Sequence, residues 1–276
     1  MKKRTLTVLM LMAGSVLTAC GNEEITEPAE TTTAPDLSKV TNEYRDYAIG
    51  EISLFVTETE KFAEAVKVGD IELAKELYAP ARAHYERAEP IAEAFGDLDP
   101  KIDAREGDIP AAEWGGYHRI EKGLWIDGTT EGYEEYAQQL IDDTKLLRAK
   151  VETVDVTPDM LVTGAVDLLN EVSTSKVKGE EDRYSHTDLY DFAANVEGAE
   201  KIFRLLQGDL EKKDEALAAE ISVRFADVYT LLNKHKKGDG YTLYNNLSET
   251  DVKELSQSID ALAEPLSQLG IVTEAL

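Results

Sequence analysis

Apolar residues recur along most of this chain at spacings of three and four, with charged residues between them. Leu73 and Leu77 show this spacing early in the chain, and Leu161, Leu168 and Val172 show it later. Such spacing gives an α-helix one apolar face. Alternating runs of β-branched residues, which would indicate strands, are nearly absent. The pattern therefore predicts an all-α fold.

Proline and glycine residues fall mostly between the periodic runs and mark the ends of the expected helices. Thr157-Pro158-Asp159 places a capping residue before a proline, and Ser248-Glu-Thr-Asp251 resembles a capping box. Pro80 lies inside one run and should kink or split it. We expect eight helices, over residues 40–68, 70–95, 110–125, 131–153, 158–177, 186–207, 209–236 and 249–268. Their mostly short connections favour antiparallel bundles, and two bundles of four helices would fit.

The first twenty residues have the composition of an export signal. A positive start, Lys2 to Arg4, precedes an apolar run over residues 6–17 that is too short to span a bilayer comfortably. The run ends in Leu-Thr-Ala-Cys, and Cys20 is the only cysteine in the chain. This ending resembles the lipobox of bacterial lipoproteins, in which the cysteine is lipidated. The alternative is an ordinary signal peptide with an incidental cysteine.

These features divide the chain into three expected parts. Residues 1–19 would be a signal peptide that is removed, and residues 20–38, rich in Glu, Thr and Pro, would form a lipidated flexible tether. Residues 39–276 would form the helical domain. We expect it to lie outside the cytoplasm, bound to the membrane through the lipid on Cys20 alone, because no later segment has eighteen uninterrupted apolar residues.

The chain is strongly acidic, with a net charge of −26. Removing the signal would take away three positive charges and no negative ones, which leaves −29. Such a surface repels nucleic acid, so we expect no nucleic-acid partner. It attracts cations, but it would also serve simply to keep an exported protein soluble.

A histidine and a glutamate with metal-ligand spacing lie within residues 114–125. His118 and Glu121 are three residues apart, so on a helix they share one face and could bind one ion. A lone histidine is more often solvated or hydrogen-bonded than a ligand. The abundance of carboxylates and the near absence of sulfur suit a hard or borderline cation.

Other carboxylates strengthen the hypothesis of a metal site, because they occur in the same helical chain as His118 and Glu121. Glu86 and Glu89 share a helix face, Asp103 lies in an acidic loop, and Asp182 lies in a polar turn before a helix. Each has an ordinary alternative as a solvated face, an exposed loop or a helix cap. Bundle cores do build metal sites from inward-facing Glu and His at this spacing. Signatures of zincin proteases, of serine hydrolases and of phosphate-binding loops are missing.

Three segments resemble the imelysin-like family, and more narrowly the EfeO/EfeM-type component of bacterial iron-uptake systems. They are residues 89–106, residues 116–125 with the His-x-x-Glu motif, and residues 179–199. The resemblance implies an all-α domain of two closely packed four-helix bundles with a metal site in the cleft between them. Motif by motif, it implies the metal residues His118, Glu121, Glu86, Glu89, Asp103 and Asp182.

The resemblance also implies a function. Iron, ferric or ferrous, would be bound and delivered to a membrane permease of an Efe-type system, with a haem peroxidase as a further partner. Zinc, copper or manganese would also fit such ligands. The cupredoxin domain of some relatives is expected to be absent, because the tether runs straight into the helical domain. We expect a binding protein; the alternatives are a metallopeptidase in which Glu121 activates water, and a cation-dependent polysaccharide-binding module.

Overall fold

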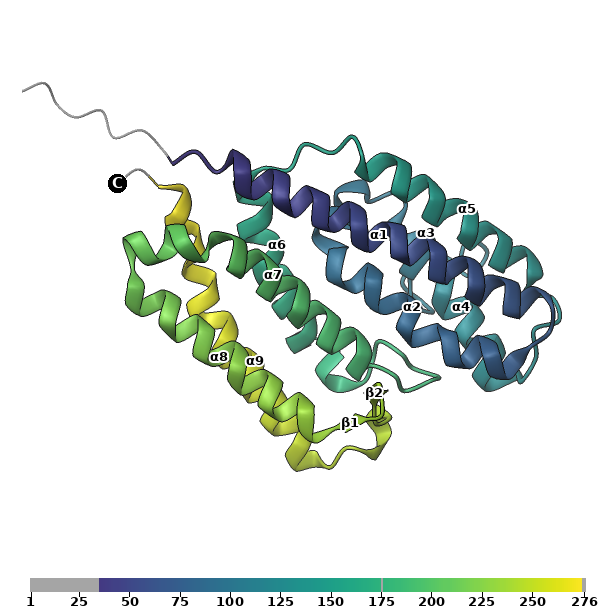
Figure 1. Ribbon diagram of the computed structural model, residues 1–276. Helices are drawn as coiled ribbons and strands as arrows, with labels where there is room; N and C mark the ends of the chain where they lie inside the picture. Colours follow the sequence, from purple (N-terminus) through teal and green to yellow (C-terminus); the bar gives the residue numbers. More distant parts are fainter. Residues whose placement is uncertain (1–34, 175, 275–276) are drawn as a thin grey trace, which may run out of the picture. The chain divides into compact units, whose positions relative to one another are not determined.

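The computed structural model describes residues 35–174 and 176–274, and over them the protein is almost entirely helical (Figure 1). The all-α prediction is confirmed. In this part of the chain the only sheet is a two-stranded antiparallel hairpin, β1 (Lys236–Lys237) and β2 (Gly240–Tyr241). The predicted signal peptide, Cys20 and most of the tether lie outside the described residues.

One group of helices is built around α1 (Ser38–Lys67), which packs against both α2 (Ile71–Ala92) and α5 (Glu134–Val151). Two short helices, α3 (Asp99–Asp103) and α4 (Gly116–Lys122), pack on each other and on α5. The chain continues from α4 into a π-helical turn, η2 (Gly123–Asp127). Three long helices and the α3–α4 segment thus make the first bundle.

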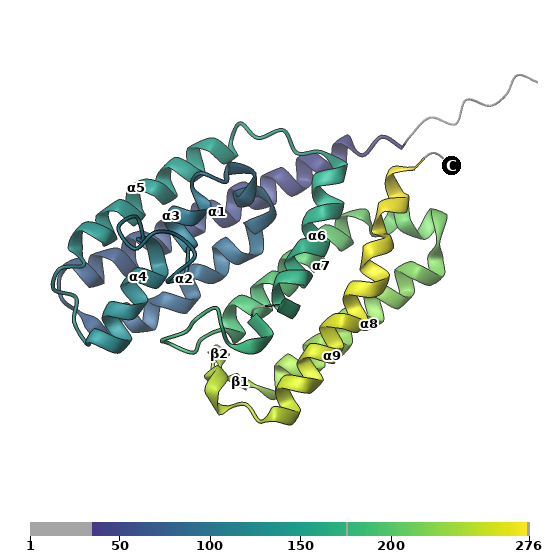
Figure 2. The same ribbon diagram turned by 180° about the vertical axis from the view of Figure 1, so that it is seen from behind.

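The second group is a four-helix bundle in which each helix contacts two others (Figure 2). Its members are α6 (Pro158–Thr174), α7 (Leu189–Lys213), α8 (Glu215–Lys234) and α9 (Glu249–Leu266). Helix α2 contacts α6 and α7 as well as α1, so it joins the two groups. Short 3₁₀ segments complete the helical elements: η1 (Glu93–Phe95), η3 (Lys176–Lys178), η4 (Tyr244–Asn246) and η5 (Ser267–Thr273).

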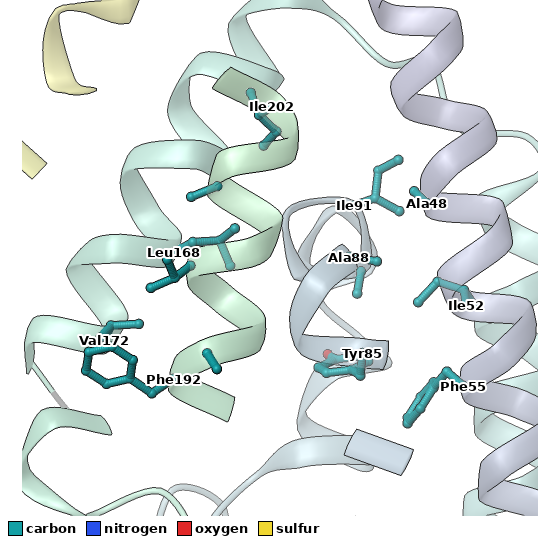
Figure 3. Close-up of a cluster of buried hydrophobic side chains, with 14 of the residues drawn as sticks. Ala48, Ile52, Phe55, Tyr85, Ala88, Ile91, Leu168, Val172, Phe192 and Ile202 are labelled. Carbon is teal, nitrogen blue, oxygen red and sulfur yellow. The ribbon is translucent and has the colours of Figure 1, made fainter. Parts of the chain in front are cut away.

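The core is continuous across the two groups. Figure 3 shows Ile52 and Phe55 of α1 facing Tyr85 of α2, and Val172 of α6 lying near Phe192 of α7. All five side chains are buried, and they belong to one hydrophobic cluster. Each large apolar side chain removed from water in this way stabilises the fold by about 1.5–3 kcal/mol. The apolar faces predicted by the spacing are therefore the faces that pack.

Several helix boundaries differ from those predicted. Helix α2 runs unbroken through Pro80, which lies on the exposed face, where water can bind the carbonyl that loses its donor. Helix α7 runs through Gly208 and ends instead before Asp214, whose side chain accepts the backbone N–H of Leu217 and caps α8. Helix α3 was not predicted, and α4 starts six residues later than expected.

The two predicted start signals are confirmed. The Ser248 hydroxyl accepts the backbone N–H of Asp251, whose carboxylate accepts the backbone N–H of Ser248. At the start of α6 the Thr157 hydroxyl accepts the backbone N–H of Met160, with Pro158 in the first position. Local chemistry therefore fixes these two ends.

Gly116 sets how closely α4 approaches α3. Its φ is +74°, and a Cβ atom there would lie 2.3 Å from the carbonyl oxygen of Ile102. Both the left-handed backbone and the contact require glycine. This close approach positions the first turn of the helix that carries His118.

Replacing Gly116 by alanine should lower the free energy of unfolding by about 2–4 kcal/mol, because it adds backbone strain and a clash. Gly50→Ala is the matched control: Gly50 lies on the exposed side of α1, and a Cβ atom there would have no atom of the described chain within 4 Å beyond its own helix. It should raise stability by about 0.5–1 kcal/mol. Urea unfolding followed by circular dichroism measures both, and equal midpoints for the two variants would contradict this account of Gly116.

Candidate metal centre

Four of the six predicted metal residues meet in one cluster. His118 and Glu121 come from α4, Asp103 from the end of α3, and Asp182 from the turn before α7. His118 Nδ1 lies 3.0 Å from Glu121 Oε2 and 3.9 Å from Asp182 Oδ1, while Nε2 lies 3.7 Å from Asp103 Oδ1. All but Asp103, which is largely covered, are fully buried. The structure therefore places carboxylates on both sides of one imidazole.

Glu181 completes the cluster and was not among the predicted residues. Its Oε1 lies 3.5 Å from His118 Nε2. Within the described chain, two groups of side chains have ligand atoms close enough to share an ion: Asp103, His118 and Glu181, and His118, Glu121 and Asp182. The motif Gly-Glu-Glu-Asp signalled an acidic turn, but the sequence did not show which of its acids points inward.

The two nitrogens of His118 have different surroundings. Nδ1 is hydrogen-bonded to Glu121, whose Oε1 accepts the backbone N–H groups of Tyr184 and Ser185 and the Ser185 hydroxyl, at 2.8–3.0 Å. Nε2 is buried and has no hydrogen-bond partner among the described residues. A carboxylate that fixes one ring nitrogen while the other faces ligands is a recurring arrangement in metal sites.

The cluster holds His118 in its protonated form. Burial and Arg82 lower the pKa of His118, but the hydrogen bond to Glu121 and the nearby Glu181 and Asp103 outweigh them and raise it to about 10. Burial raises the pKa of Glu121, but the hydrogen bond to His118 and the backbone N–H groups bring it below its usual value. A proton on the ring thus supplies one positive charge to the cluster.

At three other acids in and beside the cluster, burial outweighs the hydrogen bonds and cations that oppose it, so their pKa values are raised. Burial raises the pKa of Asp103 to about 7, although Arg82 and His118 oppose the shift. Burial and then Glu121 raise the pKa of Asp182. Burial, with Asp182 as the next cause, raises the pKa of Asp188 to about 7. The fold therefore buries more carboxyl groups than its own cations neutralise, which favours an added cation.

Arg82 of α2 is the central cation of the cluster. Its side chain is 1% exposed, and its guanidinium lies 5.8 Å from the ring centroids of both Tyr78 and Tyr117. It contacts carboxylates from four parts of the chain: Glu86 at 2.7 Å, Glu181 at 3.4 Å, Asp191 at 3.5 Å, Asp182 at 3.7 Å, and Asp103. A guanidinium keeps its charge even when buried, so these acids always face a positive group.

Glu86 and Glu89, the other two predicted ligands, lie beside a second buried cation. Lys176 Nζ bonds Glu86 and lies 3.9 Å from Glu89, and the Asn195 amide donates to Glu89 at 2.9 Å. Neither glutamate belongs to the two candidate ion-holding groups found in the described chain. The positive charge of Lys176 therefore offsets the repulsion between the two glutamates. The residues around Glu86 in the sequence could not predict this contact, because Lys176 lies ninety residues away in the chain.

A cavity of about 260 Å³ leads to the cluster. Its lining includes Asp103 and Glu181 together with Asp99, Arg105 and Asp108. Asp108 is exposed, so the cavity connects the buried carboxylates with the surface. Arg105 bridges Glu181 and Asp108 across it at 3.0 and 3.1 Å. The buried Glu181 and the largely covered Asp103 therefore share a mostly acidic cavity wall with exposed residues.

Comparison with known proteins gives the chain's relatives. The model of the Imelysin family (peptidase M75) matches residues 40–269, which include the whole cluster. The Efem/EfeO family lipoprotein of Staphylococcus haemolyticus (strain JCSC1435) is 46% identical over 99% of this chain and 100% of its own. The protein of the same name from Staphylococcus aureus (strain NCTC 8325 / PS 47) is 48% identical over 87% of this chain and 86% of its own. Across the described residues, no helix has the length and hydropathy needed to cross a bilayer.

The role of Lys176 as the partner of the glutamate pair is testable. Lys176→Met should lower the free energy of unfolding by about 3–5 kcal/mol, because it leaves Glu86 buried with less compensation. Adding Glu86→Gln should restore part of the loss. Lys145→Met is the control, since Lys145 pairs with Glu60 at the surface, and it should change stability by less than about 1 kcal/mol. Denaturant unfolding measures all three, and a Lys176→Met variant as stable as the control would refute this role.

Proposed function

We propose that this chain, which belongs to the imelysin family, captures iron outside the cytoplasmic membrane and delivers it to a membrane permease. The observation that carries the proposal is the buried Nε2 of His118, which faces Asp103 and Glu181 without a hydrogen-bond partner in the described structure. Buried polar atoms in native proteins are nearly always paired, so such an atom calls for a ligand.

The ion would bind His118 Nε2, Asp103 and Glu181. Glu121 would then orient the ring from its other nitrogen rather than bind the ion itself, because its own oxygens already accept four hydrogen bonds. One imidazole with carboxylate oxygens suits iron, and it would also accept zinc, copper or manganese. Binding would replace the proton on His118, so the ion takes over the positive charge that the cluster already holds.

The surroundings of the site support capture from solution. The acidic wall of the cavity and the net charge of −26 would raise the local concentration of cations. The lipid on Cys20 would keep the protein beside its permease, and the lipoprotein name of the relatives agrees with such an anchor. A haem peroxidase of the same uptake system would be a further partner.

The arrangement favours binding over hydrolysis. A metallopeptidase base must reach a water molecule on the ion. Glu121 lies on the Nδ1 side of the ring, away from Nε2, and backbone N–H groups already occupy its Oε1. In this proposal Glu121 positions the imidazole and does not activate water, although the family is named for a peptidase.

The site predicts which substitutions weaken binding of ferrous iron. His118→Ala, Asp103→Asn and Glu181→Gln should each weaken it by about a hundredfold or more, because each removes a ligand, whereas Glu121→Gln should weaken it by about 10–100-fold. His84→Ala is the matched control: His84 is half-buried and pairs with Glu51 at 2.8 Å, away from the cluster. Anaerobic titration against a chromophoric chelator measures the affinities.

Two outcomes would contradict the proposal. One is a His118→Ala protein that binds ferrous iron as tightly as the His84→Ala control. The other is iron-dependent cleavage of a peptide library by the wild-type protein that His118→Ala abolishes, since a carrier should leave peptides intact.

A further inference from the structure

The guanidinium of Arg82 and an ion at His118 Nε2 would need the same two oxygen atoms. Asp103 Oδ1 accepts a hydrogen bond from Arg82 Nη1 and lies 3.7 Å from His118 Nε2. Glu181 Oε1 lies 3.4 Å from Arg82 Nη2 and 3.5 Å from His118 Nε2. An ion bound by these oxygens would lie close to a buried positive charge, and the two would repel each other.

Arg82 has a second set of carboxylate oxygens near its Nε. Its Nε has no hydrogen-bond partner among the residues described, and it lies 3.5 Å from Asp191 Oδ1 and 3.7 Å from Asp182 Oδ1. Asp191 is fully buried, and neither of its oxygens has a hydrogen-bond partner within the same part of the chain. A small movement of the guanidinium would therefore exchange Asp103 and Glu181 for Asp191 without exposing the charge.

We infer that Arg82 competes with the bound ion for Asp103 and Glu181, and that Asp191 receives its guanidinium when the ion is in place. The inference rests on the proposed function. Arg82 then weakens binding, because the ion must displace a built-in cation before it gains its two carboxylates. A carrier needs such a limit on affinity, since it must release its cargo to the permease.

A purely structural role for Arg82 gives a different expectation. If Arg82 only held the cluster together, removing either Arg82 or its neighbour Asp191 would loosen the site and weaken ion binding. Competition gives opposite signs: loss of Arg82 removes the competitor, whereas loss of the Asp191 carboxyl group removes the place to which the guanidinium moves. The direction of the affinity change in the Arg82 variant, compared with that in the Asp191 variant, therefore distinguishes competition from a purely structural role.

The test is anaerobic competition titration with ferrous iron on the full domain. Arg82→Gln should bind iron at least about tenfold more tightly than wild type, and Asp191→Asn at least about threefold more weakly. Arg204→Gln is the control, because Arg204 pairs with Glu200 at the surface and its loss changes the net charge equally; its affinity should stay within about twofold. Arg82→Lys, which keeps the charge but loses the two-pronged reach, should bind more tightly than wild type and less tightly than Arg82→Gln.

The outcomes separate this inference from the proposed function. Failure of the wild-type protein to bind ferrous iron would overturn the proposed function, and this inference with it. Binding by wild type, with Arg82→Gln no tighter or Asp191→Asn no weaker, would overturn the inference alone. If Arg82→Gln does not fold, Arg82→Lys and Asp191→Asn decide: affinities that fall in both variants would overturn competition, and affinities of opposite sign would support it.

Discussion

Buried carboxylates must find positive charge inside the protein, and the junction of the two bundles depends on this requirement. An isolated carboxylate in an apolar interior would cost far more than the net stability of a domain. Arg82 and Lys176, both buried, supply charge to acids from α2, from the end of α3, from the turn before α7 and from α7 itself. The ion pairs therefore tie together segments that lie about one hundred residues apart in the chain.

The buried polar atoms around Lys176 and those around His118 differ in how many have hydrogen-bond partners. Around Lys176, the glutamate pair and Asn195 form short, direct contacts. Around His118, hydrogen-bond partners are lacking for the ring Nε2, Arg82 Nε and both Asp191 oxygens within the described residues. A fully paired network serves stability, whereas unpaired buried atoms are more typical of a site that awaits a ligand. In the part of the chain that is described, similar residues therefore form a fully paired network around Lys176 and a cluster with unpaired polar atoms around His118.

The sequence predicts those features that depend on interactions between residues close together in the chain. The helical class, the caps at Thr157 and Ser248, and the shared face of His118 and Glu121 all follow from spacing within a few residues. Glu181, Lys176 and Arg82 could not be placed, because their roles arise from packing between distant segments. The passage of α2 through Pro80 has the same origin, since tertiary contacts and solvent exposure outweigh a local helix breaker.

A crystal structure of the iron-loaded protein, with anomalous data collected at the iron edge, tests the central claim most directly. The account predicts one strong iron peak within coordination distance of His118 Nε2, Asp103 and Glu181, with Glu121 still on Nδ1 and Lys176 still on Glu86. An iron peak between Glu86 and Glu89, a peak on the Nδ1 side of His118, or no buried peak would contradict it.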